Sequence, residues 1–255
     1  MNPAPILRLE DVVKNFGGLT AVDSLDMQVS QGQICGLIGP NGAGKTTVFN
    51  LITGVYCCEK GTICLNNREI SSFKPHRITR LGVARTFQTI RLFPNLTTWE
   101  HLLIAQNFLT RTGGGKRLLP DRQREKELKA EAQEILTLLD LWQDRQRKAV
   151  TLPYGSQRKV EIARALATRP RLLLLDEPAA GMNRRETEDL LYIISKIHAQ
   201  KQGMAILVID HDMDFVMKIC DYIFVLNFGI KITEGTPDAI QNDERVKEAY
   251  LGKEE

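Results

Sequence analysis

The sequence predicts an α/β fold built on a mainly parallel β-sheet. Continuous apolar runs such as Ile34–Ile38 and Leu172–Leu175 are typical of strands that are buried on both faces. Helical patterns follow several of these runs, and this alternation of strand and helix favours parallel pairing. The length of 255 residues, with 43% hydrophobic and 25% charged residues, fits one globular domain or a core with a smaller subdomain.

Local patterns place the individual elements. The strand-like segments are Ile6–Val12, Leu25–Val29, Ile34–Ile38, Thr62–Leu65, Val83–Phe87, Leu172–Asp176, Ala205–Asp210 and Tyr222–Leu226. Helical periodicity and end signals predict helices at Lys45–Thr53, Glu186–Gln200 and Asp212–Cys220. Glu186 stands three residues after Asn183, which is the spacing of a capping arrangement. The triplet Asn227-Phe228-Gly229 predicts the turn of a last hairpin.

The middle of the chain differs, because it contains no convincing strand between about Thr97 and Thr168. Thr97-Thr98-Trp99-Glu100 is a capping box that opens one helix. A break is expected at Thr112–Gly115, and Arg122–Leu141 has the pattern of a long amphipathic helix. We therefore expect a single domain over residues 1–255, with an α/β core at 1–88 and 167–255 and a helical subdomain at 89–166.

Composition argues against several classes of protein. Mean hydropathy is −0.20, and no apolar run approaches the roughly 20 residues that a membrane helix needs. Glu10 and Asp11 interrupt the apolar start, which argues against a secretory signal. The net charge of +3 is too small to indicate a stripe that binds nucleic acid. The five cysteines, an odd number, indicate a reducing compartment, and their spacing does not suggest a zinc site.

A glycine-rich segment predicts a phosphate-binding loop. Its motif, G-x-x-x-x-G-K-[ST], follows the strand Ile34–Ile38 and runs into a helix. Glycines let backbone N–H groups point at phosphate oxygens, and the helix N-terminus adds positive potential. The Lys side chain would bridge the β- and γ-phosphates, and the hydroxyl of the following Thr would ligate Mg²⁺. The expected nucleotide-binding residues are Gly39, Pro40, Asn41, Gly42, Ala43, Gly44, Lys45, Thr46 and Thr47, with Thr46 as a metal ligand.

Two carboxylates complete the predicted site. Asp176 and Glu177 follow the apolar run Leu172–Leu175, and open α/β sheets bind ligands at the carboxyl ends of their strands. Asp176 is expected to contact the nucleotide by holding Mg²⁺ through water, and Glu177 to orient or deprotonate the water that attacks ATP. The sequence thus predicts a site for ATP and Mg²⁺.

Four further segments give the chain a specific resemblance. They are Thr86-Phe87-Gln88, Leu152–Leu166, Ala180–Asn183 and Ile209–Asp212. In this order they resemble the Q-loop, signature, D-loop and switch histidine of ABC transporter ATPases. The resemblance covers essentially the whole chain. It implies a P-loop NTPase core with a mainly parallel sheet, an antiparallel β subdomain and an inserted α-helical subdomain.

The resemblance also implies roles for single residues. Phe16 would stack on adenine, as the A-loop aromatic does. Gln88 would sense Mg²⁺, as a metal ligand, and the attacking water, and it would link the site to the helical insert. His211 would contact the γ-phosphate and orient Glu177 or the water. The catalytic residues implied are therefore Glu177, His211 and Gln88, and the other histidines receive no role.

ATPases of this family work in pairs, in which one subunit's phosphate loop and the other's signature clamp ATP. The resemblance therefore implies that Tyr154, Gly155 and Ser156 contact the nucleotide of a partner subunit. Pro153 and Tyr154 depart from the family pattern LSGGQ, in which a serine and a glycine stand at these positions. Pro has neither the hydroxyl of serine nor a backbone N–H. Asn183 replaces the usual D-loop aspartate. We expect this chain to contribute weakly to the partner's site and to pair with a different ATPase that bears a fuller signature.

Several segments resemble the LivG-like ATPases of importers for branched-chain and neutral amino acids. They are Gly82–Thr97, Tyr154-Gly155, Pro178–Asn183, the loop around Thr110–Pro120 and Ala249–Gly252. The resemblance implies ATP hydrolysis that drives uptake through two membrane permeases, together with a second, LivF-like ATPase and an extracytoplasmic binding protein. It also implies a peripheral position on the cytoplasmic face of the inner or plasma membrane. The stretch Ile90–His101 would contact a permease through Phe93 and Trp99.

Other functions stay open at this point. ATPases of lipopolysaccharide export share the Tyr-Leu-Gly tail, although the Tyr154-Gly155 signature and Arg85–Phe93 argue against them. Uptake of urea by a related importer is a second alternative. A soluble ABC ATPase that acts on nucleic acid typically has long coiled coils or two ATPase domains, which 255 residues do not hold. A regulator that binds nucleotide without turnover would not depend on Glu177. The transported molecule is not encoded here, because it does not touch this chain.

Overall fold

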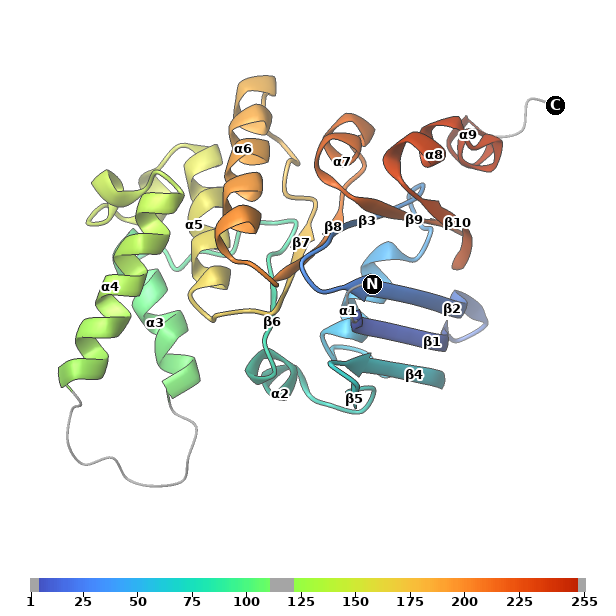
Figure 1. The fold of residues 1–255 in the computed structure, drawn as a ribbon, viewed down its shortest axis with the longest axis horizontal. Helices are drawn as coiled ribbons and strands as arrows, with labels where there is room; N and C mark the ends of the chain where they lie inside the picture. Colours follow the sequence, from blue (N-terminus) through green and yellow to red (C-terminus); the bar gives the residue numbers. More distant parts are fainter. Residues whose placement is uncertain (1–4, 111–121, 252–255) are drawn as a thin grey trace.

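The computed structural model describes residues 5–110 and 122–251, which form two β-sheets and the helices around them (Figure 1). The larger sheet has six strands in the order β10-β9-β3-β8-β7-β6. Its strands are β3 (Ile34–Ile38), β6 (Val83–Arg85), β7 (Leu172–Asp176), β8 (Ala205–Ile209), β9 (Tyr222–Asn227) and β10 (Ile230–Gly235). All neighbouring strands are parallel except β9 and β10, which form the predicted last hairpin. The prediction of a mainly parallel sheet is confirmed.

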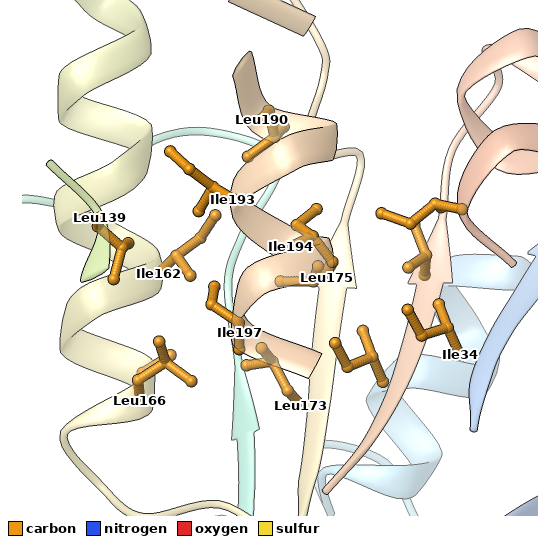
Figure 2. Packing of buried hydrophobic residues seen from close by; sticks show 14 of the residues in the cluster. Ile34, Leu139, Ile162, Leu166, Leu173, Leu175, Leu190, Ile193, Ile194 and Ile197 are labelled. Carbon is orange, nitrogen blue, oxygen red and sulfur yellow. The ribbon is translucent and has the colours of Figure 1, made fainter. Parts of the chain in front are cut away.

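Side chains alternate across the larger sheet and face two separate cores. In β7, Leu173 and Leu175 belong to the cluster that α6 (Arg184–Gln200) covers, whereas Leu172 and Leu174 belong to the other. Figure 2 shows part of the first cluster, in which Ile194 and Ile197 of α6 point toward the sheet and Ile193 points toward Ile162. Because successive side chains of a strand point to opposite faces, a sheet that is covered on both faces needs apolar residues throughout.

The second sheet is antiparallel, and its side chains share a core with the other face of the larger sheet. It consists of β1 (Pro5–Phe16), β2 (Leu19–Ser30), β4 (Lys60–Leu65) and β5 (Arg68–Glu69). The hairpin of β1 and β2 turns at Gly17, where φ is +60°. Both strands extend beyond the predicted Ile6–Val12 and Leu25–Val29. The sequence did not indicate these extensions, because the residues next to the turn are partly buried in β1 and mostly exposed in β2 and carry no apolar alternation.

The helices of the middle segment lie together at one end of the molecule (Figure 1). They are α3 (Thr98–Thr110), α4 (Arg122–Leu138) and α5 (Tyr154–Leu166), with short 3₁₀ turns η1 (Trp142–Asp144) and η2 (Ala149–Thr151). The predicted capping box is present, since the Thr97 N–H donates to Glu100 at 2.8 Å and the Glu100 N–H donates to Thr97 Oγ1 at 3.2 Å. The predicted break at Thr112–Gly115 lies outside the described residues, and the subdomain boundaries at residues 89 and 166 stay a prediction.

The other helices flank the sheets. They are α1 (Lys45–Ile52), α2 (Pro75–Arg80), α7 (Met213–Ile219), α8 (Pro237–Asn242) and α9 (Glu244–Leu251). The sequence predicts α1, α6 and α7 to within two residues at each end, but α2, α8 and α9 are short and were not expected. Among the helices within residues 5–110 and 122–251, none is both long and apolar enough to cross a membrane.

The start of α6 supports a prediction about stability. Asn183 Oδ1 accepts the Glu186 N–H at 3.0 Å, and the Asn183 N–H donates to the Glu186 carboxylate at 3.0 Å, so the predicted capping arrangement is confirmed. We expect Asn183→Ala to lower the free energy of unfolding by about 1 kcal/mol, because an orphan N–H at the helix end loses its acceptor. Urea denaturation measures this loss. Arg185→Ala is the matched control, since it leaves the cap intact, and an equal loss in both variants would contradict the prediction.

Candidate nucleotide-binding site

The predicted site residues follow four neighbouring parallel strands, which lie in the order β3-β8-β7-β6. The phosphate loop follows β3, His211 follows β8, Glu177 follows β7 and Gln88 follows β6. Because parallel strands end at the same edge of a sheet, the topology gathers at one site residues as far apart in the chain as Gly39 and His211. This edge is where open α/β sheets bind their ligands.

The glycine-rich loop has a backbone that side chains would obstruct. A methyl group on Gly39 would lie 2.1 Å from the Leu226 carbonyl oxygen, and one on Gly44 would lie 2.4 Å from the Ala21 carbonyl oxygen. Gly42 has open space beside it, but its backbone φ of +80° is one that residues with a side chain rarely adopt. The three glycines thus permit a tight curl next to β2 and β9, with the loop's outer residues exposed. Such a cradle of backbone N–H groups fits a phosphate chain.

Lys45 begins α1 and folds back over the loop. Its ammonium donates to the carbonyl oxygens of Gly39 at 2.7 Å and Pro40 at 2.9 Å, and only 8% of the residue is exposed. Burial lowers the pKa of Lys45, and the negative charge of Glu177 opposes this shift. The side chain therefore holds a desolvated positive charge at the mouth of the loop, where it fits an anionic phosphate.

Glu177, Gln88 and His211 meet at the same edge. Gln88 Nε2 donates to Glu177 Oε2 at 2.7 Å, and His211 Nδ1 lies 3.6 Å from the same carboxylate oxygen. The Glu177 backbone has a φ of +46°, which is uncommon for a residue with a side chain and is typical of functional sites. These contacts bring together the three residues that were predicted to act on the attacking water.

Asp176 has a partner that sequence reasoning missed. Arg85 Nη2 donates to Asp176 Oδ2 at 2.6 Å, and Arg85 Nη1 donates to Asn50 Oδ1 at 2.7 Å. The side chains of Arg85 and Asp176 are 8% and 7% exposed, so this ion pair is largely desolvated. The guanidinium therefore ties together α1, β6 and β7. Among the described residues, the Asp176 carboxylate accepts its hydrogen bond from Arg85 through Oδ2, so Oδ1 can serve a cation.

This pair supports a second prediction. We expect a double-mutant cycle of Arg85→Met and Asp176→Asn to give a coupling free energy of about 1–3 kcal/mol, because each single variant leaves a buried group without its partner. Urea denaturation of the four proteins measures it. The same cycle on the exposed pair Arg184 and Glu188 is the control and should give a value near zero. Independent effects of Arg85 and Asp176 would contradict the prediction.

A second missed residue connects the Gln88 loop with α5. Arg158 is fully buried, and its guanidinium donates to the carbonyl oxygens of Phe87 at 2.6 Å and Gln88 at 2.8 Å. It also donates to Glu161 at 2.8 Å, and Glu161 accepts the Phe87 N–H at 3.4 Å. Burial raises the pKa of Glu161, and the neighbouring Arg158 opposes this shift. The backbone on which Gln88 stands is thus bound to the helix that begins with the predicted signature.

Comparison with known proteins decides the family. The ABC transporter family model matches residues 22–180, and a model described as branched-chain amino acid ATP-binding cassette transporter matches residues 231–255. The high-affinity branched-chain amino acid transport ATP-binding protein BraF of Pseudomonas aeruginosa is 44% identical, over 98% of both chains. The corresponding LivG protein of Escherichia coli K12 is 42% identical, over 98% of both chains. The chain belongs to the ABC transporter family.

The solved structures agree with this assignment. The ADP conformation of MJ1267, an ATP-binding cassette of an ABC transporter, matches with a TM-score of 0.85 at 32% identity, covering 98% of this chain and 100% of that one. The prediction of an ATP-hydrolysing ABC transporter subunit with a P-loop NTPase fold is thereby confirmed. The lipopolysaccharide export protein LptB of Haemophilus influenzae is also similar, at 32% identity over 98% of both chains.

Phe16, the predicted A-loop aromatic of this ABC transporter ATPase, is the last residue of β1. Phe16 is 41% exposed, and its ring meets Tyr56 edge to face at a centroid distance of 5.1 Å. Lys14 lies 5.1 Å from the Phe16 centroid and forms an ion pair with Glu59 at 2.6 Å. The next strand, β2, approaches the phosphate loop through Ala21. An exposed aromatic ring that is held at one edge by Tyr56 is suited to stacking on a base. This geometry supports adenine contact by Phe16, which stays a prediction.

The predicted signature packs on the predicted D-loop of the same chain. Pro153 is the N-cap residue of α5, and Tyr154 opens the helix. The Tyr154 hydroxyl donates to the Ala180 carbonyl oxygen at 3.0 Å, and its ring lies 3.5 Å from the position of a methyl group on Gly181. Gly155 is buried. Contacts of Tyr154, Gly155 and Ser156 with a partner's nucleotide stay a prediction, and Tyr154 already has a role within the chain.

Asp210 and His101, two further buried titratable residues, have structural contacts. Asp210 is buried and accepts the N–H groups of Ala179 at 3.3 Å and Asp212 at 3.0 Å, and burial raises its pKa. His101 is also buried, and it accepts the Phe93 N–H through Nε2 at 2.9 Å. His101 Nδ1 faces the Thr97 carbonyl oxygen at 2.8 Å, so Nδ1 carries the proton. Asp210 thus supports the loop that carries His211, whereas His101 shapes the loop before α3.

Proposed function

We propose that this ABC transporter ATPase drives the uptake of branched-chain and neutral hydrophobic amino acids. The observation that carries the proposal is the match of residues 231–255 to the model described as branched-chain amino acid ATP-binding cassette transporter. The names of BraF and LivG, at 44% and 42% identity over nearly the full chain, support the same solute class. LptB is less similar, at 32%, which disfavours lipopolysaccharide export.

The site fits a magnesium–ATP complex through the chemistry of its donors. Backbone N–H groups of the loop and Lys45 would hold the phosphates. The Thr46 hydroxyl, Asp176 Oδ1 and the Gln88 amide oxygen are hard oxygen donors of the kind that Mg²⁺ prefers, and the last is available because Gln88 bonds to Glu177 through nitrogen. When bound, Mg²⁺ neutralises charge on the β- and γ-phosphate oxygens.

The side chains around Glu177 would perform the hydrolytic step. Glu177 would orient the attacking water and accept its proton, because its carboxylate lies near enough to Lys45 of the loop to act on the pKa of that ammonium. Gln88 fixes the carboxylate through its hydrogen bond of 2.7 Å. His211, whose side chain is 61% exposed, would contact the γ-phosphate from the neighbouring strand end.

The proposed membrane partners need a docking surface, and an apolar groove of about 460 Å³ provides one. It runs between the core and α3, and its lining includes Val55, Ile78, Phe87, Ile104 and Ala105. None of the predicted contact segment 90–101 is among the lining residues that the structure describes. We propose that a segment of a permease enters this groove, with the ATPase held peripherally on the cytoplasmic face of the membrane and the extracytoplasmic binding protein meeting only the permeases.

We propose that this chain pairs with a different, LivF-like ATPase, so that the two nucleotide sites of the pair are unequal. Pro153 offers neither hydroxyl nor N–H at a position where a family serine would reach the partner's γ-phosphate. We expect Pro153→Ser to raise turnover or ATP-driven dimerisation in the assembled complex, because a charge-assisted hydrogen bond is restored. Phosphate release and size-exclusion chromatography with Glu177→Gln in both proteins measure the two effects. Unchanged turnover and dimerisation would contradict the idea of a weak signature.

The solute class is tested with the complex rebuilt from this chain, its second ATPase, the permeases and the binding protein. We expect leucine, isoleucine and valine to stimulate ATP hydrolysis severalfold, and urea to have no effect. Stimulation by urea, or co-purification of nucleic acid in place of permeases from detergent extracts, would contradict the proposal. Phosphate release that is absent under all conditions would support a regulator without turnover.

A further inference from the structure

The phosphate loop has a contact with the far end of the chain that the proposed function does not use. The N–H of Gly39, the first residue of the loop, donates to the hydroxyl oxygen of Tyr250 at 2.8 Å. The two residues are 211 positions apart in the sequence. No backbone carbonyl within the described residues accepts this N–H. Because Gly39 itself is buried, its N–H depends on the Tyr250 hydroxyl as an acceptor.

Packing of the last two helices places the backbone that carries Tyr250, a residue that is itself 37% exposed. Ile240 of α8 and Val246 of α9 are buried, at 1% and 5% exposure, in the cluster that includes Val225 of β9. Arg245 donates to Thr233 Oγ1 of β10 at 2.8 Å. Tyr250 follows Val246 by four residues, so both side chains lie on the same face of α9. Figure 1 shows α8 and α9 beside this terminal hairpin.

The hairpin that supports α9 also supports the phosphate loop. The Leu226 carbonyl of β9 lies 2.1 Å from the position of a methyl group on Gly39. After β9, the Gly229 N–H donates to the Ala43 carbonyl oxygen at 3.0 Å. The loop therefore rests on the hairpin near both of its ends, and Tyr250 adds a bond at the point where the chain leaves β3.

We propose that Tyr250 is a positioning residue of the nucleotide site, whose hydroxyl fixes the first turn of the phosphate loop and thereby raises nucleotide affinity. This inference rests on the proposed function, because it assumes that the loop binds the phosphates of ATP. Burial raises the pKa of Tyr250, and the hydrogen bond from Gly39 opposes this shift, so the hydroxyl stays neutral near pH 7. The C-terminal segment that matches the branched-chain transporter model thus acts on the site directly.

The test uses Tyr250→Phe in the full chain, because this variant keeps the aromatic ring and removes only the hydroxyl. Calorimetric titration with Mg-ADP and Mg-ATP should show a dissociation constant raised about three- to tenfold, as expected for one lost hydrogen bond. Amide exchange followed by NMR should show the Gly39 N–H exchanging at least severalfold faster. Tyr192→Phe, on the 60% exposed tyrosine of α6, is the matched control and should change neither.

In the assembled transporter, the KM for ATP should rise while kcat stays within about twofold, since Tyr250 does not face the reacting γ-phosphate. Unchanged nucleotide affinity in Tyr250→Phe overturns the inference, whether or not Gly39 exchanges faster, and so does an equal loss in Tyr192→Phe. If the unmodified chain binds no Mg-ATP, the proposed function itself fails. If it binds Mg-ATP and Tyr250→Phe binds equally well, only the inference about Tyr250 fails.

Discussion

Glu177→Gln is expected to reduce ATP hydrolysis by about 10²- to 10⁴-fold while Mg-ATP binding persists. The amide keeps the size of the side chain and an oxygen that can face the water, but it cannot accept a proton from it. Gln88 and His211 hold this position at 2.7 Å and 3.6 Å from the same carboxylate oxygen, so the substitution changes the chemistry more than the geometry.

Two measurements check this result. Phosphate release from the assembled complex should fall to near the background rate, and calorimetric titration of the isolated chain should give an Mg-ATP affinity within a few fold of the unmodified value. Glu188→Gln, on the exposed side of α6, is the control and should hydrolyse ATP normally. Hydrolysis that survives Glu177→Gln would mean that another group takes the proton, and an equal loss of binding would mean that Glu177 holds the nucleotide.

Those parts of the site that consist of local motifs could be predicted from the sequence. The phosphate loop follows the apolar strand β3, Asp176 ends the apolar strand β7 and Glu177 follows it, and the parallel sheet brings these strand ends together. Arg85 and Tyr250 could not be assigned in this way. Arg85 pairs with a residue 91 positions away, and Tyr250 with one 211 positions away, so no spacing in the chain indicates either contact. The family resemblance drew attention to both segments, but it gave no role to either side chain.

The fold was predictable where burial on both faces makes a strand continuously apolar, as in β3, β7 and β8. It was less predictable at exposed ends. The first half of β2 alternates only weakly because most of its residues are exposed, and β5 is a pair of exposed residues. The helices α8 and α9 have six and eight residues, which is too short for helical periodicity to stand out from a loop. Their packing on β9 and β10 determines them.

Arg158→Met is expected to lower the free energy of unfolding by about 3–5 kcal/mol, because the buried Glu161 carboxylate loses its hydrogen-bonded cation and keeps only the longer ion pair with Arg164 at 3.7 Å. Both side chains are 0% exposed, so water cannot replace the lost contact. Urea denaturation of the full chain measures the change. Arg184→Met, which breaks an exposed pair with Glu188, is the control and should have little effect. A loss for Arg158→Met as small as that of the control would contradict the burial argument.

The double variant Arg158→Met with Glu161→Leu separates the contribution of Arg158 to stability from its contribution to the link between the Gln88 loop and α5. A buried ion pair can be replaced by apolar residues at little cost, so much of the lost stability should return. The guanidinium also donates to the Phe87 and Gln88 carbonyls, however, and neither Met nor Leu can do so. We therefore expect the double variant to fold well, to bind Mg-ATP, and yet to lose most of the stimulation of ATP hydrolysis by transported solute in the assembled complex. Full stimulation in that variant would show that the link between Gln88 and the signature helix does not depend on Arg158.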